Sequence, residues 1–375
     1  MSVSARIATG AVLSDYTTLR LGGPAGRLAP AASEAEIVAL VRAADRAGEP
    51  VLVLGGGSNL VIADEGFPGT VIKIASRGIR VTEGPDAGTV TVRVAAGEDW
   101  DPLVAWSVAE GLAGIECLAG IPGLAGATPI QNVGAYGQEV AQTVASVLVL
   151  DRVTGEATEL AAARCAFGYR TSMFKRAAAG AATGRFVVLA VSFTLSRPAA
   201  GQPALSAPVG YAELARRLGV EPGDRVPLAQ ARAAALELRA GKGMVLDPAD
   251  PDTRSAGSFF TNPVLTAGQF AELAERAARR CGPGTQVPGY PAGPGAEAGA
   301  IKVPAAWLIE RAGFGKGYPA PGPARISTKH TLALTSPGGG TTADLLALAR
   351  EITAGVVAAF GVDLSSEPVL VGVTL

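Results

Sequence analysis

The stretch VLVLGGGSNL, residues 51–60, decides the fold of the N-terminal part of the chain. Residues 51–54 are a continuous apolar run of strand length, which is typical of a buried strand. The glycines that follow have no Cβ, so their backbone N–H groups can converge on an anion, and Ser58 and Asn59 can add side-chain donors. The stretch contains neither GxGxxG nor the GK[ST] of a P-loop. It predicts a buried strand followed by a diphosphate-binding loop, and a plain tight turn explains these residues about equally well.

Helical and strand-like patterns surround this stretch. Ser33-Glu34-Ala35-Glu36 is a capping box, after which apolar residues recur at helical spacing until Gly48. A second helix is predicted from about Asp101, with Pro102 at its first position, to Gly111. Further strands are predicted at 71–74, 89–94, 144–150, 187–195, 331–335 and 367–373, and further helices at 228–239, 266–280, from 304, and at 342–360. The fold class is therefore α+β, with a second domain after Tyr211.

A second glycine-rich segment is AGIPGLAGATPIQNVGAYGQE, residues 119–139. It has almost no charge and offers many backbone donors, which suit a ring system and its phosphates held close to the main chain. A structural Ω-loop is the alternative explanation.

The composition limits the class of partner and the compartment. Lys and Arg total 32 against 33 for Asp and Glu, so no excess of positive charge is present to follow nucleic acid or an anionic membrane. The longest apolar stretch, 186–195, is shorter than the ~20 residues that cross a bilayer, and the run after Arg6 is too short for a secretory signal. We expect a cytoplasmic protein with no nucleic-acid or membrane partner.

The cysteines and the histidine limit the chemistry. Cys117, Cys165 and Cys281 lie far apart without metal-ligand spacing, so we expect buried free thiols and no metal site. His330 is the only histidine, which disfavours a Ser-His-Asp triad or a histidine-rich metal site.

Six motifs, taken together and in order, resemble the UDP-N-acetylenolpyruvoylglucosamine reductase family. They are LGGGSNL at 54–60, GIPG…PIQNVGAYG within 119–139, FGYRTSMFK at 167–175, SAGSFFTNP at 255–263, AAWLIERAG at 305–313 and EPVLVG at 367–372. The resemblance extends from about residue 15 to the end of the chain.

The resemblance implies an FAD-dependent reductase of cell-wall precursor synthesis. NADPH would supply hydride, and UDP-N-acetylglucosamine enolpyruvate would be reduced to UDP-N-acetylmuramate. The family binds FAD in a two-subdomain module of the vanillyl-alcohol-oxidase type, here residues 1–83 and 84–240, the latter joined by the C-terminal strand within 361–375. A substrate domain would occupy residues 241–360.

The family motifs also imply site residues. The FAD contacts would come from Leu54, Gly55, Gly56, Gly57, Ser58, Asn59, Leu60, Ile121, Pro122, Gly123, Gln131, Asn132, Gly134, Ala135, Tyr136 and Gly137. The substrate contacts would come from Tyr211, Lys242 and Asn262, where Tyr211 resembles the closing tyrosine of the longer subclass. A core tyrosine and a solvated lysine explain Tyr211 and Lys242 almost as well.

Arg170, Ser258 and Glu367 match the family's catalytic positions. Hydride addition to the enolpyruvyl double bond leaves negative charge on the neighbouring carbon and its carboxylate. Ser258 could give that carbon a proton, Arg170 offers a planar fork to the carboxylate, and Glu367 could act as a protonated hydrogen-bond donor.

Two other functions compete with this interpretation. A flavin oxidase of the same module would hold FAD through a histidine or cysteine, and Cys117 is the residue close to a glycine segment that keeps this alternative open. A binding protein without turnover is disfavoured because all three catalytic positions are intact. We expect FAD to be bound without a covalent link. The segments 177–184 and 288–299 depart from the family pattern and are predicted to be surface loops.

Overall fold

The computed structural model describes residues 8–178, 181–292 and 296–375, so parts of the predicted loops 177–184 and 288–299 lie outside the described residues. Contacts divide the chain into two compact units. The first unit comprises Met1–Ala11, Pro24–Gly57 and Phe67–Val245, and the second comprises Val12–Gly23, Ser58–Gly66 and Leu246–Leu375. In the part of the chain that the structure describes, no helix is both long and apolar enough to cross a membrane.

A parallel sheet begins the first unit. Strands β1 (Ala25–Ala31) and β2 (Val51–Leu54) both pair in parallel with β4 (Phe67–Ile74), which lies between them. The apolar run of β2 is buried at Val51, Leu52 and Leu54, as the sequence predicts for a covered strand.

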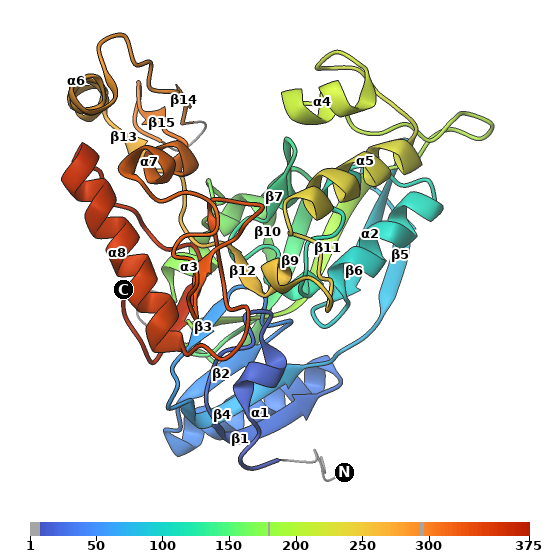
Figure 1. Ribbon diagram of the computed structural model, residues 1–375. Helices are drawn as coiled ribbons and strands as arrows, with labels where there is room; N and C mark the ends of the chain where they lie inside the picture. The colour runs from blue at the N-terminus through green and yellow to red at the C-terminus, as the bar shows by residue number, and fades with distance from the viewer. Residues whose placement is uncertain (1–7, 179–180, 293–295) are drawn as a thin grey trace. The chain divides into compact units, whose positions relative to one another are not determined.

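Helix α1 (Glu34–Ala47) packs against this sheet (Figure 1). The side chain of Ser33 accepts the N–H of Glu36, and Gly48 ends the helix in the left-handed conformation, so the predicted capping box and stop signal are confirmed. Ile37 and Val41, one turn apart on the apolar face, are fully buried.

A five-stranded antiparallel sheet forms the rest of the unit's core. Its strands, in spatial order, are β10 (Glu156–Ala161), β9 (Val144–Asp151), β11 (Phe186–Ser196), β6 (Thr89–Ala95) and β5 (Ile79–Glu83). The central strand β11 is buried almost throughout, which explains its continuous apolar run, whereas the edge strand β5 is exposed. A two-stranded ribbon, β7 (Gly134–Ala135) with β8 (Gln138–Glu139), lies within the second glycine-rich segment.

The first unit also contains α2 (Trp100–Ala109), α3 (Met173–Arg176), α4 (Ala212–Leu218) and α5 (Leu228–Gly241). Helix α2 begins at Trp100, close to the predicted start near Asp101, but the predicted position of Pro102 was wrong, because Pro102 is the third residue of the helix and not its first. Proline is tolerated there because the first turn of a helix has no internal acceptor for its N–H groups. Trp100 is buried, and its indole N–H donates to the carbonyl of Leu118 at 3.0 Å.

Among its described residues, the second unit contains three α-helices and several short strands. The helices are α6 (Ala267–Cys281), α7 (Ala305–Ala312) and α8 (Thr342–Phe360). One sheet has the spatial order β12 (Ser255–Ser258), β17 (Ala333–Thr335), β16 (Arg325–Ile326). Another has the order β13 (Val264–Leu265), β15 (Ile301–Lys302), β14 (Tyr290–Pro291). Helix α8 packs against both α6 and α7, as Figure 1 shows in red and orange.

The C-terminal strand β18 (Val369–Val371) pairs in parallel with β3 (Leu60–Ile62), and both belong to the second unit. The sequence predicts that this strand joins residues 84–240, and the structure pairs it with β3 instead. The carboxylate of Asp64, just after β3, accepts the N–H groups of Thr342 and Ala343 at 2.8 and 3.0 Å. These bonds satisfy the first turn of α8 and fix the segment after the glycine loop within the second unit.

Candidate active site

Two glycine segments of the first unit meet backbone to backbone, and we call Gly55–Gly57 and Ile121–Gly123 the glycine cradle. A Cβ on Gly56 would lie 2.7 Å from the Cα of Gly123, closer than real Cβ atoms come to backbone. Gly57 adopts φ +63°, a left-handed conformation that favours glycine. Glycine is therefore required both for the close approach and for the turn.

Lys73 on β4 contributes a positive charge to the cradle, and sequence reasoning missed it. Its Nζ donates to the carbonyl oxygen of Gly55 at 2.5 Å. Burial lowers the pKa of Lys73, while Asp99 opposes this effect and Arg77 adds to it. The signal that could have found Lys73 is a lysine inside an otherwise apolar strand, VIKI at 71–74.

Asn132 holds the second glycine-rich segment in shape. Its side-chain nitrogen donates to Oε2 of Glu139 at 2.8 Å and to the carbonyl of Gly168 at 3.1 Å, and its oxygen accepts the N–H of Ala141 at 3.1 Å. The residue is 1% exposed and has φ +50°. Its side chain is therefore engaged in supporting the loop.

Arg170 is anchored to this same segment. Its Nη2 donates to the carbonyl of Gly134 at 2.8 Å, and its Nη1 donates to that of Asn132 at 3.4 Å. Arg170 also has a left-handed backbone, with φ +51°. A non-glycine residue in that region is a strained position of the kind that clusters at functional sites.

Tyr136, Tyr211 and Lys242 come together in the first unit, and we call them the tyrosine cluster. The two rings meet edge to face with centroids 5.8 Å apart, and Nζ of Lys242 lies 5.6 Å from the centre of the Tyr136 ring. Glu213 on α4, which sequence reasoning also missed, pairs with Nζ of Lys242 at 2.7 Å. The pKa of Tyr136 is raised to about 12, mainly by burial; Arg239 opposes this rise, and Glu213 and Tyr211 contribute to it.

The second unit brings Ser258 and Glu367 onto adjacent stretches of backbone. The N–H of Glu367 donates to the carbonyl of Phe259 at 2.8 Å, and Phe260 forms an antiparallel bridge with Ser366. Phe259 and Phe260 are each 1% exposed and pack edge to face, which fixes the segment that carries Ser258.

The predicted site residues are thus distributed over both units. Leu54, the glycine cradle, Gln131–Gly137, Arg170, Tyr211 and Lys242 belong to the first unit, and Ser58, Asn59, Leu60, Ser258, Asn262 and Glu367 belong to the second. Asn262 has a structural contact, because its Oδ1 accepts the N–H of Ala305 at 2.9 Å at the start of α7. One of the points at which the chain passes from the first unit to the second lies directly after Gly57.

The three cysteines are free thiols. Cys117 and Cys165 are buried as predicted, whereas Cys281 at the end of α6 is only half-buried, because its helix ends near the surface. Burial raises the pKa of Cys117 to about 12, with a further contribution from Glu116. Burial also raises the pKa of Cys165 to about 11.

Two protein-family models match the chain. The model described as "FAD binding domain" matches residues 25–161, and the model described as "UDP-N-acetylenolpyruvoylglucosamine reductase, C-terminal domain" matches residues 248–371.

Proteins named UDP-N-acetylenolpyruvoylglucosamine reductase are similar to nearly the whole of this chain. The UDP-N-acetylenolpyruvoylglucosamine reductase of Thermobifida fusca is 59% identical over 97% of this chain and 97% of its own length. That of Streptomyces coelicolor is also 59% identical, over 97% of this chain and 90% of its own length. The crystal structure of UDP-N-acetylenolpyruvylglucosamine reductase from Thermus caldophilus superposes with a TM-score of 0.62 at 25% identity, covering 98% of this chain and 99% of that one.

The burial of the cysteines predicts their reactivity. At about pH 8, iodoacetamide should modify Cys281 in the native protein and leave Cys117 and Cys165 unmodified, because the thiolate is the reactive form and their raised pKa values keep these thiols protonated. Mass spectrometry of peptides checks this, with urea-unfolded protein, in which all three should react, as the control. Rapid modification of native Cys117 would contradict the prediction.

Proposed function

The chain belongs to the UDP-N-acetylenolpyruvoylglucosamine reductase family, and we propose that it reduces UDP-N-acetylglucosamine enolpyruvate to UDP-N-acetylmuramate in the synthesis of peptidoglycan precursors. The relatives support this along nearly the whole chain. The observation that carries the proposal is the adjacent placement of Ser258 and Glu367, which are far apart in sequence. We propose the cytoplasm as the site of action and small molecules as the partners.

The first unit fits FAD. The glycines of the cradle bring two stretches of backbone close together without Cβ atoms between them, and Lys73 brings a positive charge to Gly55, so a diphosphate has both the N–H donors and the charge that it requires. The glycine cradle and Lys73 would hold FAD, which would supply the hydride chemistry that connects NADPH with the enolpyruvyl double bond. The protein's residues must therefore hold the substrate beside the flavin and donate the proton that completes the reduction.

We propose that FAD is held without a covalent bond. The flavin-oxidase alternative depends on Cys117 as a tether, and that thiol is buried in an apolar cluster with Val209, Leu214 and Ala215. Its raised pKa keeps it protonated, and a protonated thiol is a poor nucleophile. The structure thus gives the oxidase alternative no support.

Arg170 is proposed to hold the carboxylate of the substrate. The bonds to the carbonyls of Asn132 and Gly134 fix the plane of the guanidinium, and a planar guanidinium matches the geometry of a carboxylate. A guanidinium stays charged and can stabilise the negative charge that spreads onto the carboxylate during reduction.

We propose that Ser258 donates the proton and that Glu367 stabilises the developing negative charge. Hydride adds to the terminal carbon of the double bond, the electron pair moves to the neighbouring carbon, and Ser258 gives that carbon the proton of its hydroxyl. Glu367 in its protonated form would donate a hydrogen bond to the same developing charge. The backbone bond between Glu367 and Phe259 supports a shared role.

We propose that the sugar nucleotide is held by Tyr211, Lys242 and Asn262. Tyr211 is 46% exposed at the start of α4, as a residue that closes over a ligand should be. Lys242 already pairs with one anion, the carboxylate of Glu213, and a diphosphate could take its place. The division into residues 1–83, 84–240 and 241–360 remains a prediction.

Replacing Gly56 should release FAD. In Gly56→Ala the new Cβ would meet Gly123 at 2.7 Å, so the two halves of the cradle must separate, and overpacking of this kind typically costs about 1–3 kcal/mol. The flavin absorbance per mole of purified protein checks this. Gly55→Ala is the comparison, because a Cβ there meets only the Leu124 side chain at 3.7 Å and should cause a smaller loss. Equal flavin retention in both variants would contradict the steric argument.

Replacing Ser258 should slow only the second half-reaction. We expect Ser258→Ala to retain FAD and accept hydride from NADPH normally, and to be oxidised by the enolpyruvyl substrate about 10²–10⁴-fold more slowly, because the carbanion lacks its proton donor. Stopped-flow absorbance of each half-reaction measures this.

Two further variants sharpen the Ser258 test. Ser258→Cys should recover part of the rate because a thiol is more acidic than a hydroxyl. Ser365→Ala removes an exposed serine from the facing segment and should react like the wild type. A wild-type rate of oxidation in Ser258→Ala would remove Ser258 from the mechanism.

A further inference from the structure

The only histidine of the chain lies against the proposed proton donor. Nε2 of His330 is 3.5 Å from Oγ of Ser258, although the two residues are far apart in sequence. This contact is long for a hydrogen bond, and catalytic hydrogen bonds are often long until the substrate is bound. Both residues belong to the second unit and are half-buried.

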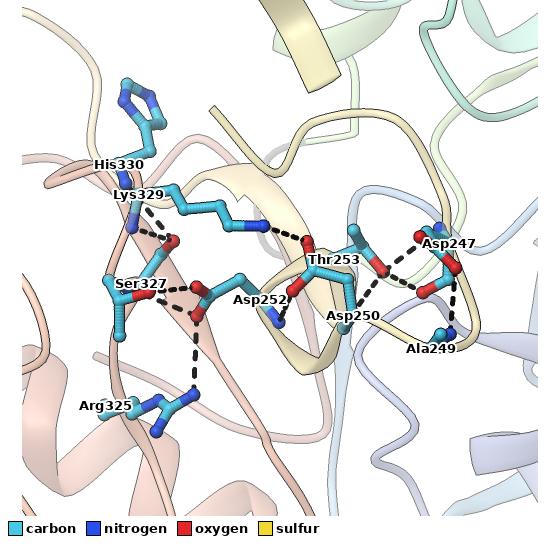
Figure 2. Close-up of polar contacts among 10 residues, drawn as sticks. Asp247, Ala249, Asp250, Asp252, Thr253, Arg325, Ser327, Lys329 and His330 are labelled. Carbon is cyan, nitrogen blue, oxygen red and sulfur yellow. Dashed lines mark hydrogen bonds and ion pairs between the residues drawn. The ribbon is translucent and has the colours of Figure 1, made fainter. Parts of the chain in front are cut away.

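A turn holds the backbone of His330 in place. Oγ of Ser327 accepts the N–H groups of Lys329 at 3.0 Å and His330 at 3.2 Å, and the carbonyl of His330 accepts the N–H of Ala333 at 3.1 Å. Figure 2 shows the imidazole ring pointing away from the polar contacts that fix this turn. These contacts thus fix the backbone of His330, and its imidazole ring points away from them.

Two carboxylates brace the turn from the segment that precedes Ser258. Asp252, which is 3% exposed, accepts the hydroxyl and the N–H of Thr328 and lies 3.5 Å from a guanidinium nitrogen of Arg325. Asp250 pairs with Nζ of Lys329 at 2.6 Å (Figure 2). The Coulombic attraction of these pairs ties residues 325–330 to residues 250–252.

The braced segment leads directly into the strand that carries Ser258. Residues 250–253 are followed by β12, which ends at Ser258 and pairs with β17 so that Ser258 is opposite Ala333. The N–H of Phe259 also donates to the carbonyl of Leu332 at 2.7 Å. Ser258 and His330 therefore lie on two neighbouring segments that are connected both before and after these residues. These connections fix the distance between the two side chains.

We propose that His330 is a positioning residue for Ser258, which orients the serine hydroxyl and returns the proton that Ser258 gives to the substrate. The inference rests on the proposed function of Ser258. An N–H at Nε2 that donates to Oγ leaves the serine O–H free to point at the substrate carbon.

The proton step balances without any further reactant. The Oγ–H bond of Ser258 breaks as the carbon–hydrogen bond of the product forms, which leaves the electron pair on Oγ. The protonated imidazole of His330 then gives its Nε2 proton to Oγ and becomes neutral, and solvent reprotonates the ring. Histidine is suited to this exchange because its side chain gains and loses a proton near neutral pH.

The contact itself can be tested without substrate. Because the chain has one histidine, tag-free protein should show a single set of imidazole signals by NMR. Ser258→Ala should shift these signals, and Ser365→Ala should leave them in place. Unshifted signals in Ser258→Ala would mean that the two side chains do not touch in solution, and the inference would fail.

The role is tested in the oxidation of NADPH-reduced holoenzyme by UDP-N-acetylglucosamine enolpyruvate. His330→Ala should be slowed about 10-fold to 100-fold in this step alone, less than the loss expected for a direct general acid. Added imidazole should restore part of the rate. His330→Gln should stay slow, since its amide can donate a hydrogen bond but cannot give up a proton.

The double variant separates this role from a general effect on the fold. If His330 acts only through Ser258, then Ser258→Ala/His330→Ala should be no slower than Ser258→Ala alone. Multiplied losses, equal losses in both half-reactions, or a wild-type rate in His330→Ala or His330→Gln would overturn the inference. Failure of the wild type to react with the substrate would instead overturn the proposed function.

Discussion

The hydrogen bonds on both sides of Phe259 are the constraint on which the placement of Ser258, Glu367 and His330 in the second unit depends. Its N–H donates to Leu332 on one side, and its carbonyl accepts from Glu367 on the other. Since backbone polar groups that are buried must be paired, these bonds fix three segments from distant parts of the chain at adjacent positions. Ser258, Glu367 and His330 are each within one or two residues of these bonds, so their placement follows from the backbone.

The first unit depends on a different constraint, the contact between Gly56 and Gly123. Here the absence of side chains, and not a specific bond, allows two loops to approach. Charge is then added from a neighbouring strand by Lys73. The side chain of Asn132 holds the second glycine-rich segment in shape, and the carbonyl of the same residue accepts a hydrogen bond from Arg170. The glycine-rich segment 119–139 thus contains both Gly123 of the glycine cradle and the carbonyls that anchor Arg170.

Local features were predictable from the sequence, and contacts between distant segments were not. The boundaries of α1 follow from a capping side chain and a terminal glycine a few residues apart, so Ser33 and Gly48 sufficed. The pairing of β18 with β3 and the approach of His330 to Ser258 depend on how remote segments pack, which no local pattern encodes. The candidate residues themselves came from motif resemblance. The residues that hold the candidates in place, such as Glu213 and Asp252, belong to no recognisable motif, and only the structure identifies them.

The central claim is that this chain passes hydride from NADPH to an enolpyruvyl sugar nucleotide, and a single-turnover experiment tests it most directly. The purified wild-type protein is reduced with one equivalent of NADPH under anaerobic conditions and then mixed with UDP-N-acetylglucosamine enolpyruvate. The account predicts that the yellow colour returns and that UDP-N-acetylmuramate forms in an amount equal to the bound flavin. Flavin that stays reduced with this substrate, but is oxidised rapidly by oxygen, would contradict the account and favour a flavin oxidase.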